Sequence, residues 1–250
     1  MSQLRKMSKK NQFISCTSKI DSSLIGMSLA MEPQSVVIAV LGTGPKTGKF
    51  TTQLFLNQYL SQIGYCVKNI CTEPQAFLFG FKTLPIGNQN LLDIISMDRQ
   101  IEYIRTSIFI ESLAMPDIII VGGQSGVIPF SREIVVDFNS LSSSMVMLAS
   151  KPDGIVLCIN PTDDVEYIER TISGINAYGY GKVLVCVMSD LIKNQIIRDG
   201  VVYTGDTHMT TEQLDAQCKI VENRIQTPVV HFRSLQAVRR CILILQEAFS

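Results

Sequence analysis

A run of six apolar residues that ends in a glycine-rich turn places the strongest constraint on the fold. Residues 36–41 are uninterrupted and mostly β-branched, which is typical of a strand buried on both faces of a sheet. After the turn, residues 49–63 carry apolar side chains at helical spacing, and Gly64 stands where a helix often ends. A strand buried on both faces needs a layer of helices above and below it. The segment therefore predicts an α/β domain.

The same pattern recurs along the rest of the chain. Further short apolar runs are found at residues 66–71, 117–121, 154–159, 182–188 and 228–232, and helical segments lie between them. Parallel strands need crossover connections of this kind. We therefore expect a three-layer α/β/α fold with a mostly parallel sheet over residues 35–250, and a partly ordered basic arm over residues 1–34.

Composition narrows the classes of function. The chain has 250 residues with 22 Lys and Arg against 22 Asp and Glu, whereas a nucleic-acid-binding protein normally carries excess positive charge. Its 7 cysteines form no CxxC pair, and no apolar stretch near the N-terminus is long enough for a membrane span. A neutral, apolar surface favours self-association. These features predict a cytoplasmic oligomer with no nucleic-acid or membrane partner.

The glycine-rich turn after the first strand has the composition of a phosphate-binding loop. It consists of Gly42, Thr43, Gly44, Pro45, Lys46, Thr47, Gly48, Lys49, Phe50 and Thr51. Backbone N–H groups of such a loop and of the following helix N-terminus can hold phosphate oxygens, and Lys49 can reach the terminal phosphate. We therefore expect these residues to bind a nucleoside triphosphate such as ATP, with Lys49 as the catalytic group. A strand-to-helix turn without a ligand is the alternative.

Coordination of Mg²⁺ is less well matched. The P-loop pattern places Ser or Thr directly after the lysine, but this chain has Phe50 there and Thr51 one position later. Thr51 is therefore the expected metal ligand. The third predicted strand ends in Gly122, where P-loop NTPases have an acidic residue that positions the metal. The neighbouring Gly123 and Gln124 are expected either to approach the nucleotide or to pack against the loop.

Other polar residues also follow predicted strands. Asp190 ends the fifth strand and is a candidate to accept a hydrogen bond from a purine base. Glu73 follows the second strand, where it can favour a helix N-terminus or orient a water. Asp163 and Asp164 are expected to cap the next helix, and His208, in a polar segment, is expected in a loop.

These motifs resemble known families. The segment from Gly42 to Lys49 is similar to the phosphate loop of dethiobiotin synthetase and of the dimeric P-loop class that includes signal-recognition and MinD-type ATPases. It resembles the DUF1611 family more closely, although that family has a glutamate at the place of Gly122. A still closer resemblance is to a clostridial-type peptide maturation family found beside radical-SAM enzymes in bacteriocin-like gene clusters. Its members share a Gly-Lys-Phe loop and a Leu-Phe-Gly-Phe segment like residues 78–81.

The resemblance implies a P-loop NTPase-like fold, a nucleotide or other phosphate-bearing ligand, and a homodimer. The resembled families usually carry an additional N-terminal Rossmann-like domain, for which residues 1–34 leave no room. Three functions stay open. The first is an ATP-dependent enzyme of ribosomal-peptide maturation that meets a precursor peptide or a companion enzyme. The second is a non-catalytic pseudo-NTPase partner, and the third is a coenzyme A-dependent acyltransferase.

Overall fold

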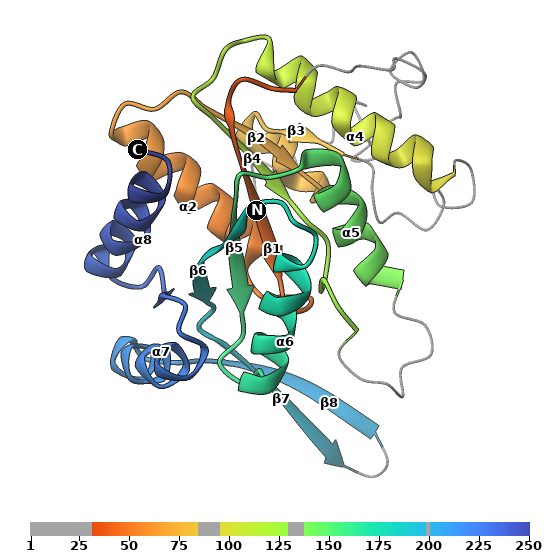
Figure 1. Cartoon of the computed structure of the whole chain (residues 1–250). Coiled ribbons are helices and arrows are strands. Elements are labelled where there is room, and N and C mark those ends of the chain that lie inside the picture. Colours follow the sequence, from red (N-terminus) through yellow and green to blue (C-terminus); the bar gives the residue numbers. More distant parts are fainter. Residues whose placement is uncertain (1–31, 85–95, 130–137, 199–200) are drawn as a thin grey trace, which may run out of the picture.

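A seven-stranded sheet forms the centre of the computed structural model, which describes residues 32–84, 96–129, 138–198 and 201–250 (Figure 1). Every pair of neighbouring strands is parallel, in the order β3-β2-β4-β1-β5-β6-β9. The strands are β1 (Val36–Gly42), β2 (Val67–Cys71), β3 (Lys82–Thr83), β4 (Ile118–Gly122), β5 (Gly154–Ile159), β6 (Lys182–Met188) and β9 (Val229–Val230). The predicted strand at residues 36–41 is therefore central, between β4 and β5.

Helices cover both faces of this sheet, which confirms the predicted three-layer architecture. Alternate residues of β1 point to opposite faces. Ile38 packs with α2 (Lys49–Gln62) and α8 (Leu235–Ala248) on one face. Val37 and Ala39 pack on the other face with α4 (Met97–Ser112), α5 (Phe138–Ser150), α6 (Val165–Asn176) and α7 (Thr211–Ile225). None of the helices in the described part of the chain has the length and hydropathy needed to cross a membrane.

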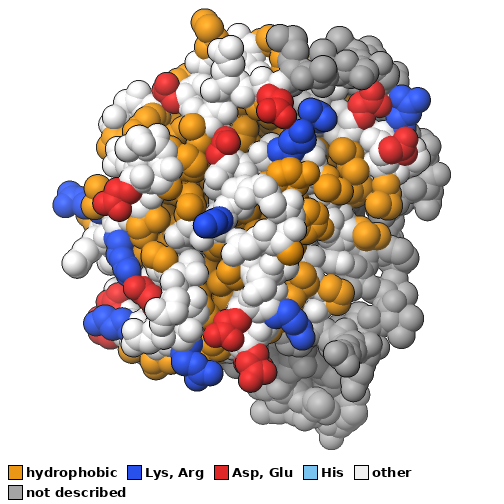
Figure 2. Space-filling view, in the orientation of Figure 1, with side chains coloured by type: hydrophobic (Ala, Val, Ile, Leu, Met, Phe, Trp, Pro, Cys, Tyr) orange, Lys and Arg blue, Asp and Glu red, His pale blue; other side chains and the backbone are white. Residues whose placement is uncertain are grey.

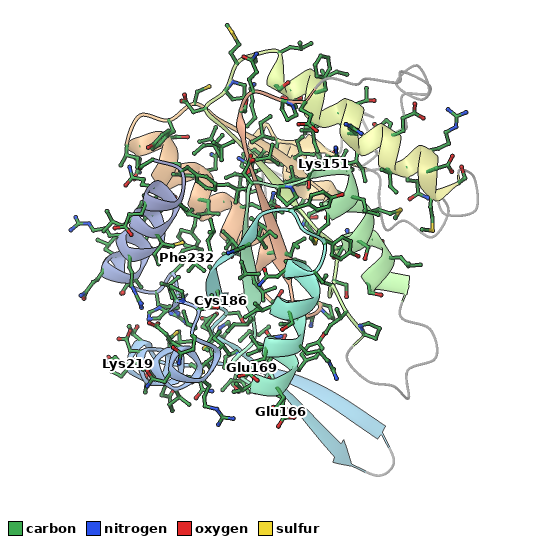
Figure 3. The ribbon with its side chains drawn as sticks, in the orientation of Figure 1. Lys151, Glu166, Glu169, Cys186, Lys219 and Phe232 are labelled. Carbon is green, nitrogen blue, oxygen red and sulfur yellow. The ribbon has the colours of Figure 1, made fainter. Side chains whose placement is uncertain are left out.

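The outer surface of these helices mixes polar side chains with exposed apolar ones such as Leu148 and Leu243. Glu166 and Glu169 on α6 point away from the sheet (Figure 3). On the face of the molecule shown in Figure 2, acidic and basic side chains are scattered singly among apolar ones, without a basic cluster.

An antiparallel hairpin that the sequence did not predict follows β6. It consists of β7 (Leu191–Arg198) and β8 (Val201–His208), and it extends away from the body at the lower edge of Figure 1. The expectation that His208 lies in a loop is wrong, because His208 is the last residue of β8 and is paired with Leu191. A two-stranded ribbon outside the core does not need the continuous apolar run that marks a buried strand.

Candidate nucleotide site

The glycine-rich turn lies at the carboxyl edge of the sheet, where ligands bind in folds of this kind. We call residues 42–48 the phosphate loop; they join β1 to α2. Gly48 is the N-cap of α2 and has φ +84°, a left-handed conformation that favours glycine. At Gly42 a Cβ would lie 2.5 Å from Thr47 Oγ1, so a larger residue does not fit. The loop therefore bends tightly where it enters α2, and the N-terminus of a helix favours an anion.

The side chain of Lys49 folds back over this loop. Its Nζ donates to the carbonyl oxygen of Gly44 at 2.8 Å and lies 3.4 Å from Thr47 Oγ1. Lys49 is only 8% exposed, so its charge is largely removed from bulk water. A partly desolvated cation beside a helix N-terminus attracts an anion more strongly than an exposed lysine would.

Contacts from the β5–α6 region hold the outer side of the phosphate loop. The hydroxyl of Thr43 donates to the carboxylate of Asp163, which also accepts from the backbone N–H of Asn160 at 2.8 Å. Tyr167 on α6 donates its hydroxyl to the carbonyl of Thr43 at 2.7 Å. The expectation that Asp163 caps α6 is therefore wrong, and only Asp164 does so, by accepting from Glu166 N.

The two residues after Lys49 have different surroundings. The ring of Phe50 packs edge to face on Phe79, with centroids 5.7 Å apart, and Phe79 lies 6.2 Å from Phe81. Thr51 is exposed and lines a cavity beside the loop. The P-loop pattern places its metal-binding hydroxyl one position earlier, where this chain has Phe50.

The turn after β4 packs against α2 and against the ends of β1 and β2. A Cβ at Gly122 would lie 2.3 Å from Gln53 Oε1, and Gln53 donates to the carbonyl of Ile70 at 3.2 Å. The N–H of Gly123 donates to Val40 O at 2.9 Å, and Gln124 Nε2 donates to Thr72 O at 3.4 Å. Gly123 and Gln124 thus tie the ends of β1, β2 and β4 together beside the phosphate loop.

A cavity of about 460 Å³ opens beside the phosphate loop. Phe55 and Phe232, whose ring centroids are 5.0 Å apart, form an apolar wall; Phe232 lies between β9 and α8 (Figure 3). Lys46, Asp190, His208 and Arg233 line it as well, and they are half-buried or exposed. A larger cavity of about 720 Å³ lies at the opposite edge of the sheet, but none of its described lining residues is Lys or Arg. The smaller cavity is therefore better suited to a nucleotide.

Asp190, the predicted base-binding residue, belongs to a charged cluster at this cavity. Its Oδ2 accepts from Arg233 Nε at 2.9 Å and lies 2.9 Å from His208 Nδ1. Burial raises the pKa of Asp190, but the hydrogen bonds from His208 and Arg233 outweigh it and hold that pKa below its ordinary value. The carboxylate is therefore ionised at neutral pH. Lys46 in the phosphate loop also pairs with Asp206 on β8, at 3.6 Å.

Several residues that shape the site were not predicted from the sequence. Arg233 and Phe55 line the cavity, Tyr167 holds the phosphate loop, and Gly126 lies under it: a Cβ at Gly126 would be 2.7 Å from Thr43 O. Of these residues, only Gly126 belongs to a motif that the sequence shows, the second glycine-rich turn. The others come from segments that carry no motif.

Comparison with known proteins identifies a family and a fold. A family model described as "Domain of unknown function (DUF1611_C) P-loop domain" matches residues 25–235. A search of curated protein sequences finds no match. Among solved structures, the chain is similar to a DUF1611 family protein from Anabaena variabilis, at 14% identity and TM-score 0.59, over 93% of this chain and 60% of that one. The chain thus spans less than two thirds of that relative.

Two other similar structures are described with bound nucleotides. One is a cobyrinic acid a,c-diamide synthase from Mycobacterium smegmatis with an ATP analogue and magnesium, at 14% identity and TM-score 0.52, over 86% of this chain and 96% of that one. The other is a nucleotide-binding protein from Archaeoglobus fulgidus with ADP and cobalt, at 14% identity and TM-score 0.50, over 86% and 89%. At this identity they establish the P-loop NTPase-like fold.

Proposed function

The chain belongs to the DUF1611 family of P-loop domains, and we propose that it binds a nucleoside triphosphate with its phosphates on residues 42–49. The observation that carries this proposal is the convergence of the Lys49 amino group and the N-terminus of α2 on a loop that requires glycine at positions 42 and 48. Phosphate oxygens suit such a site because they accept hydrogen bonds from backbone N–H groups and carry the opposite charge.

The cavity beside Thr51 is the proposed place of the nucleobase. An aromatic wall of Phe55 and Phe232 suits the faces of a planar base. The bonds from Arg233 and His208 both reach Oδ2 of Asp190. In the described part of the chain this leaves Oδ1 to accept from an amino group of the base. The resemblance and the DUF1611 fold support ATP as the first nucleotide to test.

Calorimetric titration with ATP tests this proposal directly. Removal of a charge-assisted hydrogen bond costs about 1.5–3 kcal/mol, so Lys49→Ala is expected to raise the Kd roughly 10- to 100-fold. Lys182→Ala is a matched control, because Lys182 is exposed and begins β6 at the opposite edge of the sheet. Unchanged affinity in Lys49→Ala, with binding intact in the control, would refute the phosphate site.

The finer proposal is an ATP-dependent role in ribosomal-peptide maturation, in a cytoplasmic homodimer. Its support is the resemblance, together with one contact: the Gly-Lys-Phe and Leu-Phe-Gly-Phe segments that carry the resemblance meet through Phe50 and Phe79. Leu78 is 68% exposed and Phe79 54%, so an apolar surface adjoins the phosphate loop and can take apolar side chains of a peptide. Weaker binding of the precursor peptide to Phe79→Ser, with ATP affinity unchanged, is the expected result.

Phe50 and Gly122 favour a second candidate, a non-catalytic partner that holds nucleotide without turning it over. Both stand where P-loop NTPases have groups that position the metal. Phosphate release over hours separates the two, since Mg²⁺-dependent hydrolysis that Lys49→Ala abolishes would exclude the non-catalytic role. Competition between acetyl-CoA and ATP in the same titration tests the coenzyme A-dependent acyltransferase.

A further inference from the structure

The P-loop fold implies a bound Mg²⁺ ion, and the ion can bind only where the residues at its usual ligand positions meet its requirements. Mg²⁺ takes oxygen ligands in near-octahedral geometry and keeps several waters, so it needs a polar space beside the phosphates. Its usual protein ligands are the hydroxyl after the loop lysine and a carboxylate at the end of a neighbouring strand.

The hydroxyl position does not fit the ion. Phe50 occupies it, and this half-buried ring packs on Phe79 with a centroid distance of 5.7 Å. An apolar ring supplies neither a ligand to the ion nor a hydrogen bond to the waters that Mg²⁺ retains. Thr51, the ligand expected from the sequence, lines the cavity beside the phosphate loop.

The carboxylate position does not fit either. Gly122 stands there, and the Gln53 side chain fills the adjoining space: its Oε1 would be 2.3 Å from a Cβ at Gly122. Gln53 is 2% exposed, and its Nε2 is bound to Ile70 O, so the amide is held in this place. A side chain that blocks even a methyl group leaves no room for a carboxylate.

Among the described residues, the other carboxylates at this edge do not replace the missing ligands. Asp163 is bound to Thr43 and Asn160, and Asp190 to Arg233 and His208. Glu73 is half-buried and precedes a short 3₁₀ helix (Pro74–Phe79) at the end of β2. Among the described residues, Glu73 is not part of a group of possible metal ligands. Within residues 32–84, 96–129, 138–198 and 201–250, no three His, Cys, Asp or Glu side chains gather as a metal site.

From this mismatch we infer that the phosphate loop takes its nucleotide in the metal-free form. The inference rests on the proposed function and specifies its ligand: a bare nucleoside triphosphate whose charge is balanced by Lys49 and the N-terminus of α2. At its two usual ligand positions a hydrated Mg²⁺ would meet an apolar ring and a buried amide in place of a hydroxyl and a carboxylate, so the metal chelate does not bind. Mg²⁺ therefore acts as a competitor that removes the ligand from solution.

Titration of the full chain with ATP, in EDTA and in excess MgCl₂ at equal ionic strength, tests the inference. The apparent Kd rises in inverse proportion to the fraction of bare nucleotide, so about a tenth left bare gives a roughly tenfold rise. An unchanged or lower Kd in MgCl₂ would overturn the inference while leaving the proposed function intact. No binding in either buffer would refute the proposed function, and this inference with it.

A designed variant tests the cause. Phe50→Thr combined with Gln53→Ala and Gly122→Asp restores a hydroxyl and a carboxylate and clears the space between them. We expect this variant, if its circular dichroism is native, to bind ATP more tightly in MgCl₂ than in EDTA. Glu73→Gln in the otherwise unchanged chain is the matched control and should keep the wild-type preference for EDTA. A switch of preference in Glu73→Gln would show that Glu73 governs the metal dependence and would overturn the assignment to Phe50 and Gln53.

Discussion

Replacement of Gly122 by alanine tests the packing between α2 and the end of β4. The added Cβ would meet the Gln53 side chain at 2.3, 2.9 and 3.1 Å, so the amide has to leave its place. Overpacking of a dense core costs about 1–3 kcal/mol. The lost hydrogen bond from Gln53 to Ile70 O adds about 0.5–1.5 kcal/mol. We therefore expect Gly122→Ala to lower the free energy of unfolding by roughly 2–4 kcal/mol.

A double-mutant cycle separates this clash from any other effect of the methyl group. Gln53→Ala alone leaves Ile70 O without its donor, at a cost of about 1–3 kcal/mol. In the double variant the methyl group enters the space that Gln53 vacates, so the second substitution adds little. The coupling energy is expected to be about 1–3 kcal/mol in favour of the double variant.

Urea denaturation followed by circular dichroism measures these differences from the midpoint at constant m. Gly205→Ala is the control, because a Cβ at Gly205 meets nothing within 4 Å, and we expect it to change the stability by less than about 0.5 kcal/mol. Wild-type stability in Gly122→Ala, or a coupling energy near zero, would show that Gln53 does not occupy this space. Position 122 would then have room for a carboxylate.

Three further predictions concern the support of the site. Gly126→Ala places a Cβ 2.7 Å from Thr43 O and should shift the phosphate loop, so we expect weaker ATP binding in calorimetry although residue 126 does not touch the ligand. An affinity equal to that of the wild type would show that the loop does not shift. Tyr167→Phe removes a hydrogen bond to Thr43 and should cost about 1 kcal/mol in urea denaturation, with a higher Kd for ATP. Because the pKa of Asp190 is lowered on folding, its ion pairs stabilise the protein above the unfolded pKa of about 4, and this stability is lost as the pH falls through the lower folded pKa. Melting temperatures measured from pH 7 to pH 2 should therefore fall less steeply in Asp190→Asn, and identical slopes would contradict this assignment.

The central strands were predictable because their burial is complete. Residues 36–41 and 154–159 form adjacent strands that are covered by helices on both faces, and only a continuous apolar run satisfies that environment. The strand expected at residues 228–232 is shorter, since β9 pairs with β6 over Val229 and Val230 alone. After it, His231 turns the chain by accepting from the N–H of Arg233. Edge strands and the β7–β8 hairpin have a less continuous run of apolar residues because part of their surface meets solvent.

The position of the phosphate loop was likewise predictable, because it depends on a contiguous strand, glycine turn and helix. The roles of the two residues after Lys49 were not. Phe50 faces Phe79, which is brought beside α2 by the end of β2 and the short 3₁₀ helix that follows it. Thr51 faces a cavity whose other walls come from β6 and the β9–α8 segment. Neither neighbour is encoded in the loop itself.

The sequence by itself determined what local chain geometry controls: a buried parallel strand, a tight glycine turn, and a lysine at the first residue of a helix. The tertiary structure decided what surrounds them. Three contacts show this: Thr43 with Asp163, Asp190 with Arg233, and Gln53 with the space beside Gly122. The residues of each pair lie between 43 and 120 positions apart in the chain. Such pairs depend on the order of strands in the sheet and on the length of every connection between them, and no local pattern of residues specifies either.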